Sequence, residues 1–331
     1  YGAGTASVRF ICGTFEPHRV LEERISSFLG VESAYTFVSC WNATEALFPT
    51  LCENGDVIVS DELNHACIID SMRLTTSISR DVKKVIYKHS DMNSLKESLE
   101  KAIELKSDDG VIFVITDGVF SMEGDIAVLP DIRSLCDKFS AMLVVDDSHG
   151  TGVMGETGRG THEHYGMAGS DIDLFTGTLG KALGGGAGGY VAGRSQAIEL
   201  LVQRGRPTLF SNALPVTVAC SAKAAIDTLD SNPSLVQKLR DNVAAARKGI
   251  GEVGFEVLES PTAICPIIVG ETATAISMSN ALLDIGCFAI GFGYPVVPEG
   301  EARIRVQISA AHEEEHINRL CEALAKLKSD L

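Results

Sequence analysis

The stretch TGTLGKALGGGAGGYVAG, residues 176–193, places a single lysine between two apolar segments. Lys181 directly follows the apolar run 171–179, and several glycines separate it from a second run at 188–193. A nucleotide-binding P-loop has its glycines ahead of the lysine and a Ser or Thr directly after it. Here Ala182 follows Lys181 and the glycines come later, so the order of the residues excludes that loop. The stretch instead predicts two buried strands joined by a glycine-rich turn, with the lysine at the end of the first strand.

Outward from this stretch, short apolar runs alternate with helical patterns over the first two-thirds of the chain. We expect further buried strands at 56–61, 110–119 and 141–149. Helical patterns lie at 16–30, 93–105, 131–139 and 195–205. Because strands without polar alternation are typical of a sheet that is covered on both faces, the pattern predicts an α/β fold with a mainly parallel sheet.

The pattern changes from about residue 215 onward. Helices are predicted at 216–229, 234–254, 274–286 and 313–331, and strands at 255–260, 265–270, 288–294 and 303–309. This order is typical of a smaller α+β domain with a mainly antiparallel sheet. We therefore expect a large domain at 1–220 and a smaller one at 221–331.

Composition narrows the classes of function. The chain has 331 residues and a formal net charge of −16, which argues against a nucleic-acid partner. No apolar run is long enough to span a membrane. The nine cysteines include no CxxC pair and lie mostly in apolar surroundings, which is typical of reduced thiols in a cytoplasmic protein. The histidines of THEHYG and AAHEEEH lack a convincing third ligand, so we expect no metal site.

Two polar positions follow predicted strands. Asp146 comes at the carboxyl end of the apolar run 142–145, where ligands of open α/β sheets bind, and His149 lies three residues on. A helix N-cap at Asp146 or Asp147 would explain these carboxylates equally well. Lys181 has Gly, Leu and Ala as neighbours, so we expect partial desolvation that lowers its pKa and makes the amine a nucleophile.

Two weaker indications of a binding site lie earlier in the chain than Asp146 and Lys181. Residues 39–44 lie at a strand-to-helix junction, where free N–H groups and the helix dipole favour an anion, although an ordinary capped helix is the simpler interpretation. His65 has small and apolar neighbours and could lie flat against a ring, or could be a satisfied core histidine.

Together these signals match one ligand, pyridoxal 5'-phosphate (PLP). Lys181 would bind its aldehyde, Asp146 would keep the pyridine nitrogen protonated, and the helix start at 39–44 would hold the phosphate.

The motifs TGTLGKALGGGAGGYVAG, VVDDSHGTG, SDELNHACIID, TDGVFSMEGD and RPTLFSNAL resemble those of the α-oxoamine synthases, a branch of the fold-type I PLP enzymes. The resemblance covers essentially the whole chain. The stretches GTASVRFICGT, GRPTLFSNALP and YPVVPEGEARIRVQISAAH are most similar to the glycine C-acetyltransferase (2-amino-3-ketobutyrate CoA ligase) branch. The resemblance implies an aspartate aminotransferase-like fold, with a large mainly parallel-sheet domain and a smaller C-terminal α+β domain.

The resemblance also implies residue roles. Lys181 would carry PLP as a covalent aldimine, Asp146 would pair with the pyridine nitrogen and His149 with the phenolic oxygen. His65 would stack on the ring and contact substrate, and Arg305 would bind the substrate carboxylate as a bidentate fork. Further cofactor contacts would come from the backbone amides of Cys40 and Trp41, from Ser121 and Thr178, and from Ser211 and Asn212 of the neighbouring subunit.

The implied enzyme is a cytoplasmic homodimer (of the mitochondrial matrix in a eukaryote) with its active site at the subunit interface. It would condense glycine with acetyl-CoA to 2-amino-3-oxobutyrate and CoA, or cleave that product in threonine degradation. A sister synthase such as 8-amino-7-oxononanoate synthase or a secondary-metabolite member is the alternative, and a non-catalytic partner subunit is a third interpretation.

Two departures from the family pattern stand out. Family members carry a segment with an Asn-Tyr-Leu-Gly-type motif ahead of the position where Tyr1 stands, and that segment helps to shape the pocket and the dimer. Asn42 and Thr44 stand where the resemblance predicts Asp and Asn. Because that loop lies near the cofactor, we expect effects on acyl or amino-acid preference.

Overall fold

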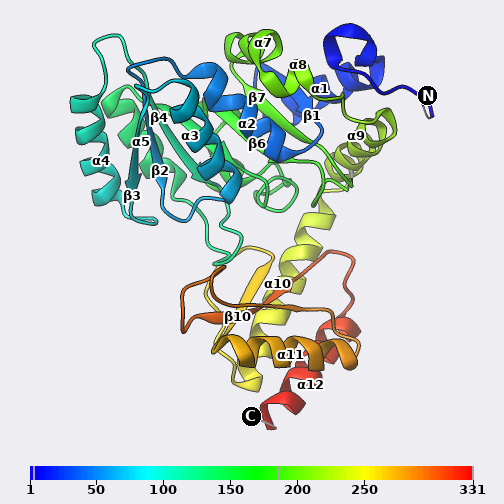
Figure 1. Ribbon diagram of the computed structural model, residues 1–331. Helices are drawn as coiled ribbons and strands as arrows, with labels where there is room; N and C mark the ends of the chain where they lie inside the picture. The colour runs from blue at the N-terminus through cyan, green and yellow to red at the C-terminus, as the bar shows by residue number, and fades with distance from the viewer. Residues whose placement is uncertain (3, 185, 330–331) are drawn as a thin grey trace. The chain divides into compact units, whose positions relative to one another are not determined.

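The computed structural model describes residues 1–2, 4–184 and 186–329. The chain divides into two compact units, Tyr1–Val119 with Ala127–Asn232, and Phe120–Ile126 with Pro233–Leu331 (Figure 1). The expected boundary at residue 220 falls inside helix α9 (Val216–Ser231), which belongs to the first unit. The assignment of 1–220 and 221–331 as domains stays a prediction.

A seven-stranded sheet forms the centre of the first unit, in the order β1-β7-β6-β5-β4-β2-β3. Neighbouring strands run parallel except at β7, which pairs antiparallel with β1 and β6. The predicted strand at 188–193 therefore exists, but its direction is opposite to that of the rest. The strands are β1 (Ser33–Phe37), β2 (Val57–Asp61), β3 (Lys83–Tyr87), β4 (Ile112–Asp117), β5 (Met142–Asp146), β6 (Leu174–Thr178) and β7 (Gly189–Gly193).

Helices connect these strands and pack against the sheet (Figure 1). The sequence gives them amphipathic faces, and α1 begins with a proline in its first turn and ends at Gly30, which has a left-handed backbone. Besides α9, the helical segments of the first unit are η1 (Arg9–Gly13), α1 (Glu16–Leu29), α2 (Cys40–Leu51), α3 (Ala66–Ile78), α4 (Met92–Leu105), α5 (Leu129–Phe139), α6 (Thr161–His164), η2 (Gly169–Asp171), α7 (Ser195–Arg204) and α8 (Arg206–Phe210).

The second unit contains a three-stranded antiparallel sheet in the order β8-β10-β9. This agrees with the antiparallel sheet that the sequence predicts there. Residues 255–260 form no strand and contribute only a bridge from Val257 to Ile267. The elements are α10 (Ser234–Val253), β8 (Ile264–Gly270), α11 (Thr272–Asp284), β9 (Ile290–Phe292), β10 (Ala302–Gln307) and α12 (Glu314–Ser329).

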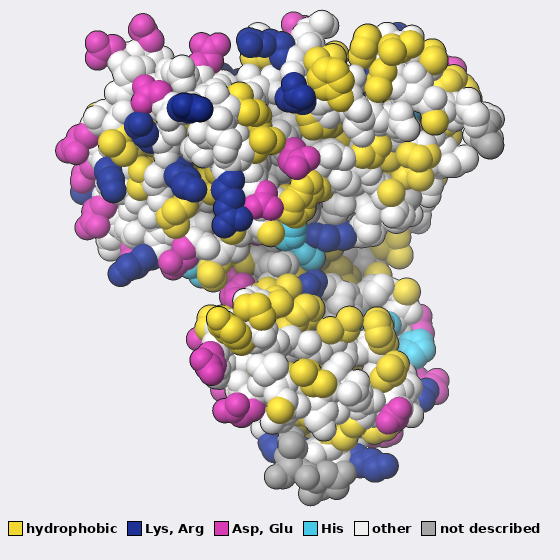
Figure 2. Space-filling model, in the orientation of Figure 1, with side chains coloured by type: hydrophobic (Ala, Val, Ile, Leu, Met, Phe, Trp, Pro, Cys, Tyr) yellow, Lys and Arg dark blue, Asp and Glu magenta, His cyan; other side chains and the backbone are white. Residues whose placement is uncertain are grey.

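The surface carries acidic, basic and apolar side chains interspersed on the face that Figure 2 shows. Within the described residues, every helix is too short or too polar to cross a membrane. The same residues contain no group of three or more His, Cys, Asp or Glu side chains placed to hold a metal ion.

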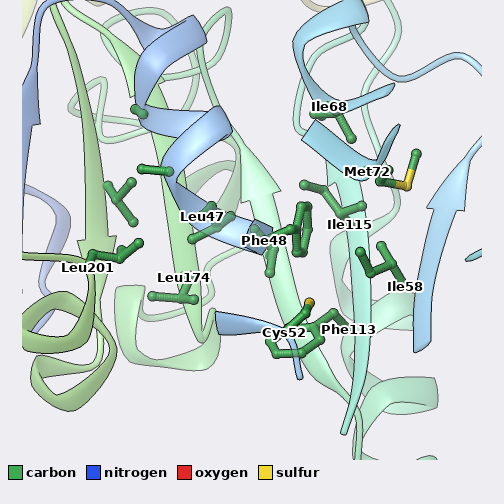
Figure 3. Packing of buried hydrophobic residues seen from close by; sticks show 14 of the residues in the cluster. Leu47, Phe48, Cys52, Ile58, Ile68, Met72, Phe113, Ile115, Leu174 and Leu201 are labelled. Atoms are coloured by element: carbon green, nitrogen blue, oxygen red, sulfur yellow. The ribbon is translucent and has the colours of Figure 1, made fainter. Parts of the chain in front are cut away.

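The core of the first unit fixes the position of α2. Leu47 and Phe48 of this helix are fully buried against the sheet, where Phe48 meets the ring of Phe113 at a centroid distance of 6.0 Å (Figure 3). Ile68 and Met72 of α3 and Leu201 of α7 complete the same cluster. Because this packing is apolar and dense, the start of α2 is held rigidly beside the edge of the sheet.

A buried ion pair ties the N-terminal turn to α1 and β1. Arg9 Nη1 and Nη2 donate to the two carboxylate oxygens of Glu22 at 2.7 and 3.1 Å. Glu22 Oε1 also accepts from the N–H and the hydroxyl of Thr36 at 2.9 and 2.8 Å. The Arg9 guanidinium lies 4.2 Å from the ring centre of Tyr35. The pair is therefore satisfied on all sides, as burial of two charges requires.

The substitution Glu22→Ala should destabilise the fold strongly, because it leaves the Arg9 charge buried without a partner. We expect the free energy of unfolding to fall by about 3 kcal/mol. Urea denaturation followed by circular dichroism measures this change. Asp70→Ala removes the exposed Asp70–Arg73 pair and is the matched control, with a loss below about 1 kcal/mol. Equal losses in the two variants would contradict the importance of the buried pair.

Candidate active site

The candidate site lies at the carboxyl edge of the large sheet, within the first unit. Strands β4 and β5 both end in an aspartate, and the register pairs Asp117 with Asp146. Asp146 is also paired with Thr176 of β6, and Lys181 lies in the loop that follows β6. The parallel direction of these strands therefore brings residues that are far apart in sequence to one edge.

Asp146 is buried and accepts three hydrogen bonds, with 4% of its surface exposed. Its Oδ1 accepts from the Ser148 N–H at 3.0 Å, and its Oδ2 accepts from the Thr176 hydroxyl at 2.9 Å and from the Cys40 thiol at 3.6 Å. Burial raises the pKa of the Cys40 thiol well above its ordinary value, so the thiol keeps its proton and donates. These donors offset the cost of burying the carboxylate.

Asp147 has a different role. It is fully buried, and its carboxylate accepts from the N–H and hydroxyl of Thr161 at 3.0 and 2.6 Å and from the Thr151 hydroxyl at 3.0 Å. Burial raises the pKa of this carboxyl, and the bonds from Thr161 oppose that shift. Asp147 therefore holds the loop after β5 in shape, which leaves Asp146 as the aspartate of the site.

Lys181 and His149 are in direct contact, with 2.9 Å between Lys181 Nζ and His149 Nε2. His149 is half-buried, whereas Lys181 is exposed in the single chain. The expectation that its neighbours Gly, Leu and Ala partly desolvate the lysine and lower its pKa stays a prediction.

The start of α2 offers two backbone N–H groups. Ser39 caps the helix, since its hydroxyl accepts from the Asn42 N–H at 3.1 Å and its carbonyl accepts from Ala43. The N–H groups of Cys40 and Trp41 precede the first intrahelical bond. That of Cys40 takes part in the parallel bridge between Ser39 and Gly188, whereas that of Trp41 has no hydrogen-bond partner among the described residues. Unpaired N–H groups at the positive end of a helix dipole are suited to a phosphate.

His65 lies at the N-cap of α3, close to the same helix start. Its Nδ1 accepts from the Cys67 N–H at 3.2 Å, so the neutral ring carries its proton on Nε2. The ring stands edge-on to that of Trp41, with 6.5 Å between centroids. His65 is exposed as a whole, yet desolvation of its ring lowers its pKa; Asp146 opposes this shift and Lys181 adds to it.

Three further predicted residues lie in the first unit. The Thr178 hydroxyl donates to the Gly188 carbonyl at 3.2 Å and accepts from the Gly180 N–H at 3.1 Å. Ser211 and Asn212 line a small cavity. Asn42, which lies in the first turn of α2, lines the same cavity. The assignment of Ser211 and Asn212 to the neighbouring subunit's site stays a prediction.

The other two predicted residues belong to the second unit. Ser121 lies in the segment Phe120–Ile126, and Arg305 lies on β10, where it donates to Gln307 Oε1 at 3.2 Å. Arg305 forms no ion pair with a described residue, whereas Arg303 is fully buried and paired with Glu123 and Glu301. The roles of Ser121 and Arg305 stay predictions, and of the two arginines only Arg305 has its charge unmatched.

The sequence patterns did not predict three residues that lie at the site, namely Asp117, Thr176 and Ser148. Asp117 carries the same signal as Asp146, an aspartate directly after a continuous apolar run, and could have been found by it. Thr176 and Ser148 are hydroxyl residues without a distinctive pattern, and only the contacts with Asp146 reveal them.

Comparison with known proteins places this geometry in a family. The model for class I and II aminotransferases matches residues 3–324. The 2-amino-3-ketobutyrate coenzyme A ligase of Escherichia coli is 43% identical over an alignment of 332 residues, which covers 100% of this chain and 81% of the ligase. The mitochondrial ligase of Homo sapiens is 43% identical over 327 residues, 99% of this chain and 76% of its own.

Two further relatives belong to other enzyme types. The 8-amino-7-oxononanoate synthase of Thermoanaerobacter pseudethanolicus is 43% identical over 331 residues, 100% of this chain and 81% of its own. A serine palmitoyltransferase variant from S. paucimobilis, solved with a bound PLP–myriocin aldimine, superimposes with a TM-score of 0.92 at 28% identity, covering 100% of this chain and 81% of that one.

These matches confirm the fold class and the resemblance that the motifs predict, because they extend over nearly the whole chain and both units. The chain is a member of the class I and II aminotransferase family and, within it, of the α-oxoamine synthases.

Proposed function

We propose that this protein is a PLP-dependent acyltransferase that condenses glycine with acetyl-CoA to 2-amino-3-oxobutyrate and CoA, or catalyses the reverse cleavage. The observation that carries the proposal is the 43% identity over the full chain to the E. coli ligase, in a chain that keeps Lys181 in contact with His149 beside a buried Asp146.

The residues present fit PLP. The N–H groups of Cys40 and Trp41 at the start of α2, of which that of Trp41 is unpaired among the described residues, would hold its phosphate. The buried carboxylate of Asp146 would face its pyridine nitrogen. His149 would contact the phenolic oxygen and His65 would cover the ring. When bound through Lys181, PLP supplies the electron sink that stabilises negative charge at the Cα of an amino acid.

The chain's own residues move the protons. Lys181 Nζ would take the proton from the Cα of the amino-acid substrate and later return one, and His149, 2.9 Å from that amine, would orient it. Asp146 provides the negative charge that keeps a pyridine nitrogen protonated. The predicted role of Arg305, which has no ion-pair partner among the described residues, is to bind the substrate carboxylate. His149 also polarises the acyl carbonyl of the thioester.

A homodimer is part of the proposal. Lys181 is exposed in the single chain, and exclusion of water from this amine needs a cover. The first unit also exposes large apolar side chains, with Phe10, Ile11 and Phe210 at 65, 68 and 71%. A second copy of the chain would bury such side chains and cover the site. Ser211 and Asn212 of each copy would then contribute to the site of the other. We place the enzyme in the cytoplasm, or in the mitochondrial matrix of a eukaryote.

A second candidate function is favoured by one observation. The T. pseudethanolicus 8-amino-7-oxononanoate synthase is as similar to this chain as the ligases are, at 43% identity. That enzyme type joins alanine to a pimeloyl thioester with the same lysine, aspartate and histidine, so these residues do not separate the two functions.

The variant Lys181→Ala should lose the visible absorption band of protein-bound PLP and turnover together. We expect kcat to fall at least about 1000-fold, because the variant lacks both the covalent attachment and the general base. Absorption spectra and a CoA-release assay measure the two effects. Lys223→Ala, which removes a lysine paired with Asp227 on α9, is the control and should keep both. Full activity in Lys181→Ala would refute the proposed role of the lysine.

Substrate preference separates the two candidate functions. CoA release, measured with glycine, alanine and serine against acetyl-, hexanoyl- and pimeloyl-CoA, should give the highest kcat/KM for glycine with acetyl-CoA. A highest value for alanine with pimeloyl-CoA would establish the second candidate instead.

A further inference from the structure

We propose that Asp117 is a positioning residue of the site: its carboxyl group holds the backbone N–H of His65 and thereby sets where the His65 ring lies. This inference deepens the proposed function, since it assumes that His65 covers the bound cofactor.

The contact joins the end of a strand to the turn before a helix. Asp117 ends β4, whereas His65 precedes α3, and Asp117 Oδ2 accepts from the His65 N–H at 3.0 Å. Asp117 is 5% exposed, so the bond is shielded from water. Among the described residues this N–H is the one hydrogen-bond donor to the Asp117 carboxyl group.

A buried asparagine completes the connection. Asn64, which is 4% exposed, accepts from the Asp117 N–H at 2.7 Å and donates to the Ile115 carbonyl at 2.9 Å and the Ser60 hydroxyl at 2.8 Å. The turn before α3 is thus fixed to β4 by two side chains. With its main chain held on this side and its Nδ1 bonded to the Cys67 N–H, His65 has little freedom to turn away from the site.

Asp117 and Asp146 form a pair of carboxyl groups at the ends of β4 and β5, and this pairing affects the pKa of Asp117. Asp117 and Asp146 are register partners, and two neighbouring buried carboxyl groups cannot both carry charge without a large cost. Desolvation, with the charge of Asp146 as the next cause, raises the pKa of Asp117 well above its ordinary value. The bond from the His65 N–H needs only an acceptor oxygen at this position, which asparagine also provides.

Trp41 makes the position of His65 measurable. It is the single tryptophan of the chain and its ring is 6.5 Å from that of His65. A protonated imidazole quenches indole emission at short range, so emission should fall as the pH drops through the pKa of His65, which desolvation places below its ordinary value. The titratable groups around the ring are Cys67, Asp146 and Lys181, with Asp117 at its backbone.

The experiment compares Asp117→Leu and Asp117→Ala with Asp117→Asn. The first two remove the acceptor, and Leu nearly keeps the volume if Ala fails to fold. We expect both to lose most of the pH-dependent change in Trp41 emission, measured without cofactor, and to bind PLP about fivefold more weakly. Asp117→Asn keeps an acceptor and should stay within about twofold of the unmodified chain in both measurements.

Asp61→Ala is the matched control. Asp61 ends β2, is 3% exposed, and accepts from the N–H groups of Leu63 and Ser90, so its loss also disturbs a buried carboxylate at a strand end. The Asp61→Ala variant should be less stable, but the pH titration of Trp41 emission and the affinity for PLP should stay unchanged. His65→Asn should abolish the titration, and a titration that persists there would overturn the pairing of Trp41 with His65.

Folded Asp117→Leu with an unchanged titration and unchanged PLP affinity overturns the inference. Equal losses in Asp117→Asn and Asp117→Leu also overturn it, because the acceptor would then not be what matters. Failure of the proposed function looks different, since the unmodified chain itself would not bind PLP.

Discussion

Burial of the Asp146 carboxylate is the constraint on which the rest of the site depends. A carboxylate that is 4% exposed at the end of β5 needs donors close by, and here they come from three places: the next turn of the chain, the neighbouring strand β6 and the first residue of α2. The same contacts hold the start of α2 and the end of β6, which precedes Lys181, beside the aspartate. The hydrogen bonds that stabilise the buried carboxylate therefore also fix the geometry of the site.

The supporting structure is apolar. Helix α2 carries no charged residue in its first turn and packs Leu47 and Phe48 into the core, so its start is placed by side chains several residues further on (Figure 3). Precision at Cys40 and Trp41 comes from dense packing at the other end of the helix. The buried Arg9–Glu22 pair serves the same purpose for β1, which lies next to β7 and the lysine loop.

Much of the fold was predictable because its strands are continuous apolar runs. The segments at 56–61, 110–119, 141–149 and 171–179 all contain observed strands. Strand β3 was not predicted, because it lies at the edge of the sheet and its Lys83, Lys84 and Ile86 face outward. The direction of β7 was also missed, since an apolar run carries no information about which neighbour it pairs with. Residues 255–260 look like a strand locally but find only a bridge.

The sequence by itself determined the family and the cofactor chemistry, and it predicted Lys181 as the reactive lysine. It could do so because the order of lysine and glycines, and the aspartate after an apolar run, are local patterns. Only the tertiary structure decided which groups share the site. It brought Asp117 beside Asp146, put the Cys40 thiol on the carboxylate and left Lys181 exposed in the single chain. The reason is physical: burial and charge–charge interactions depend on distances between strands, and no spacing along the chain specifies those distances.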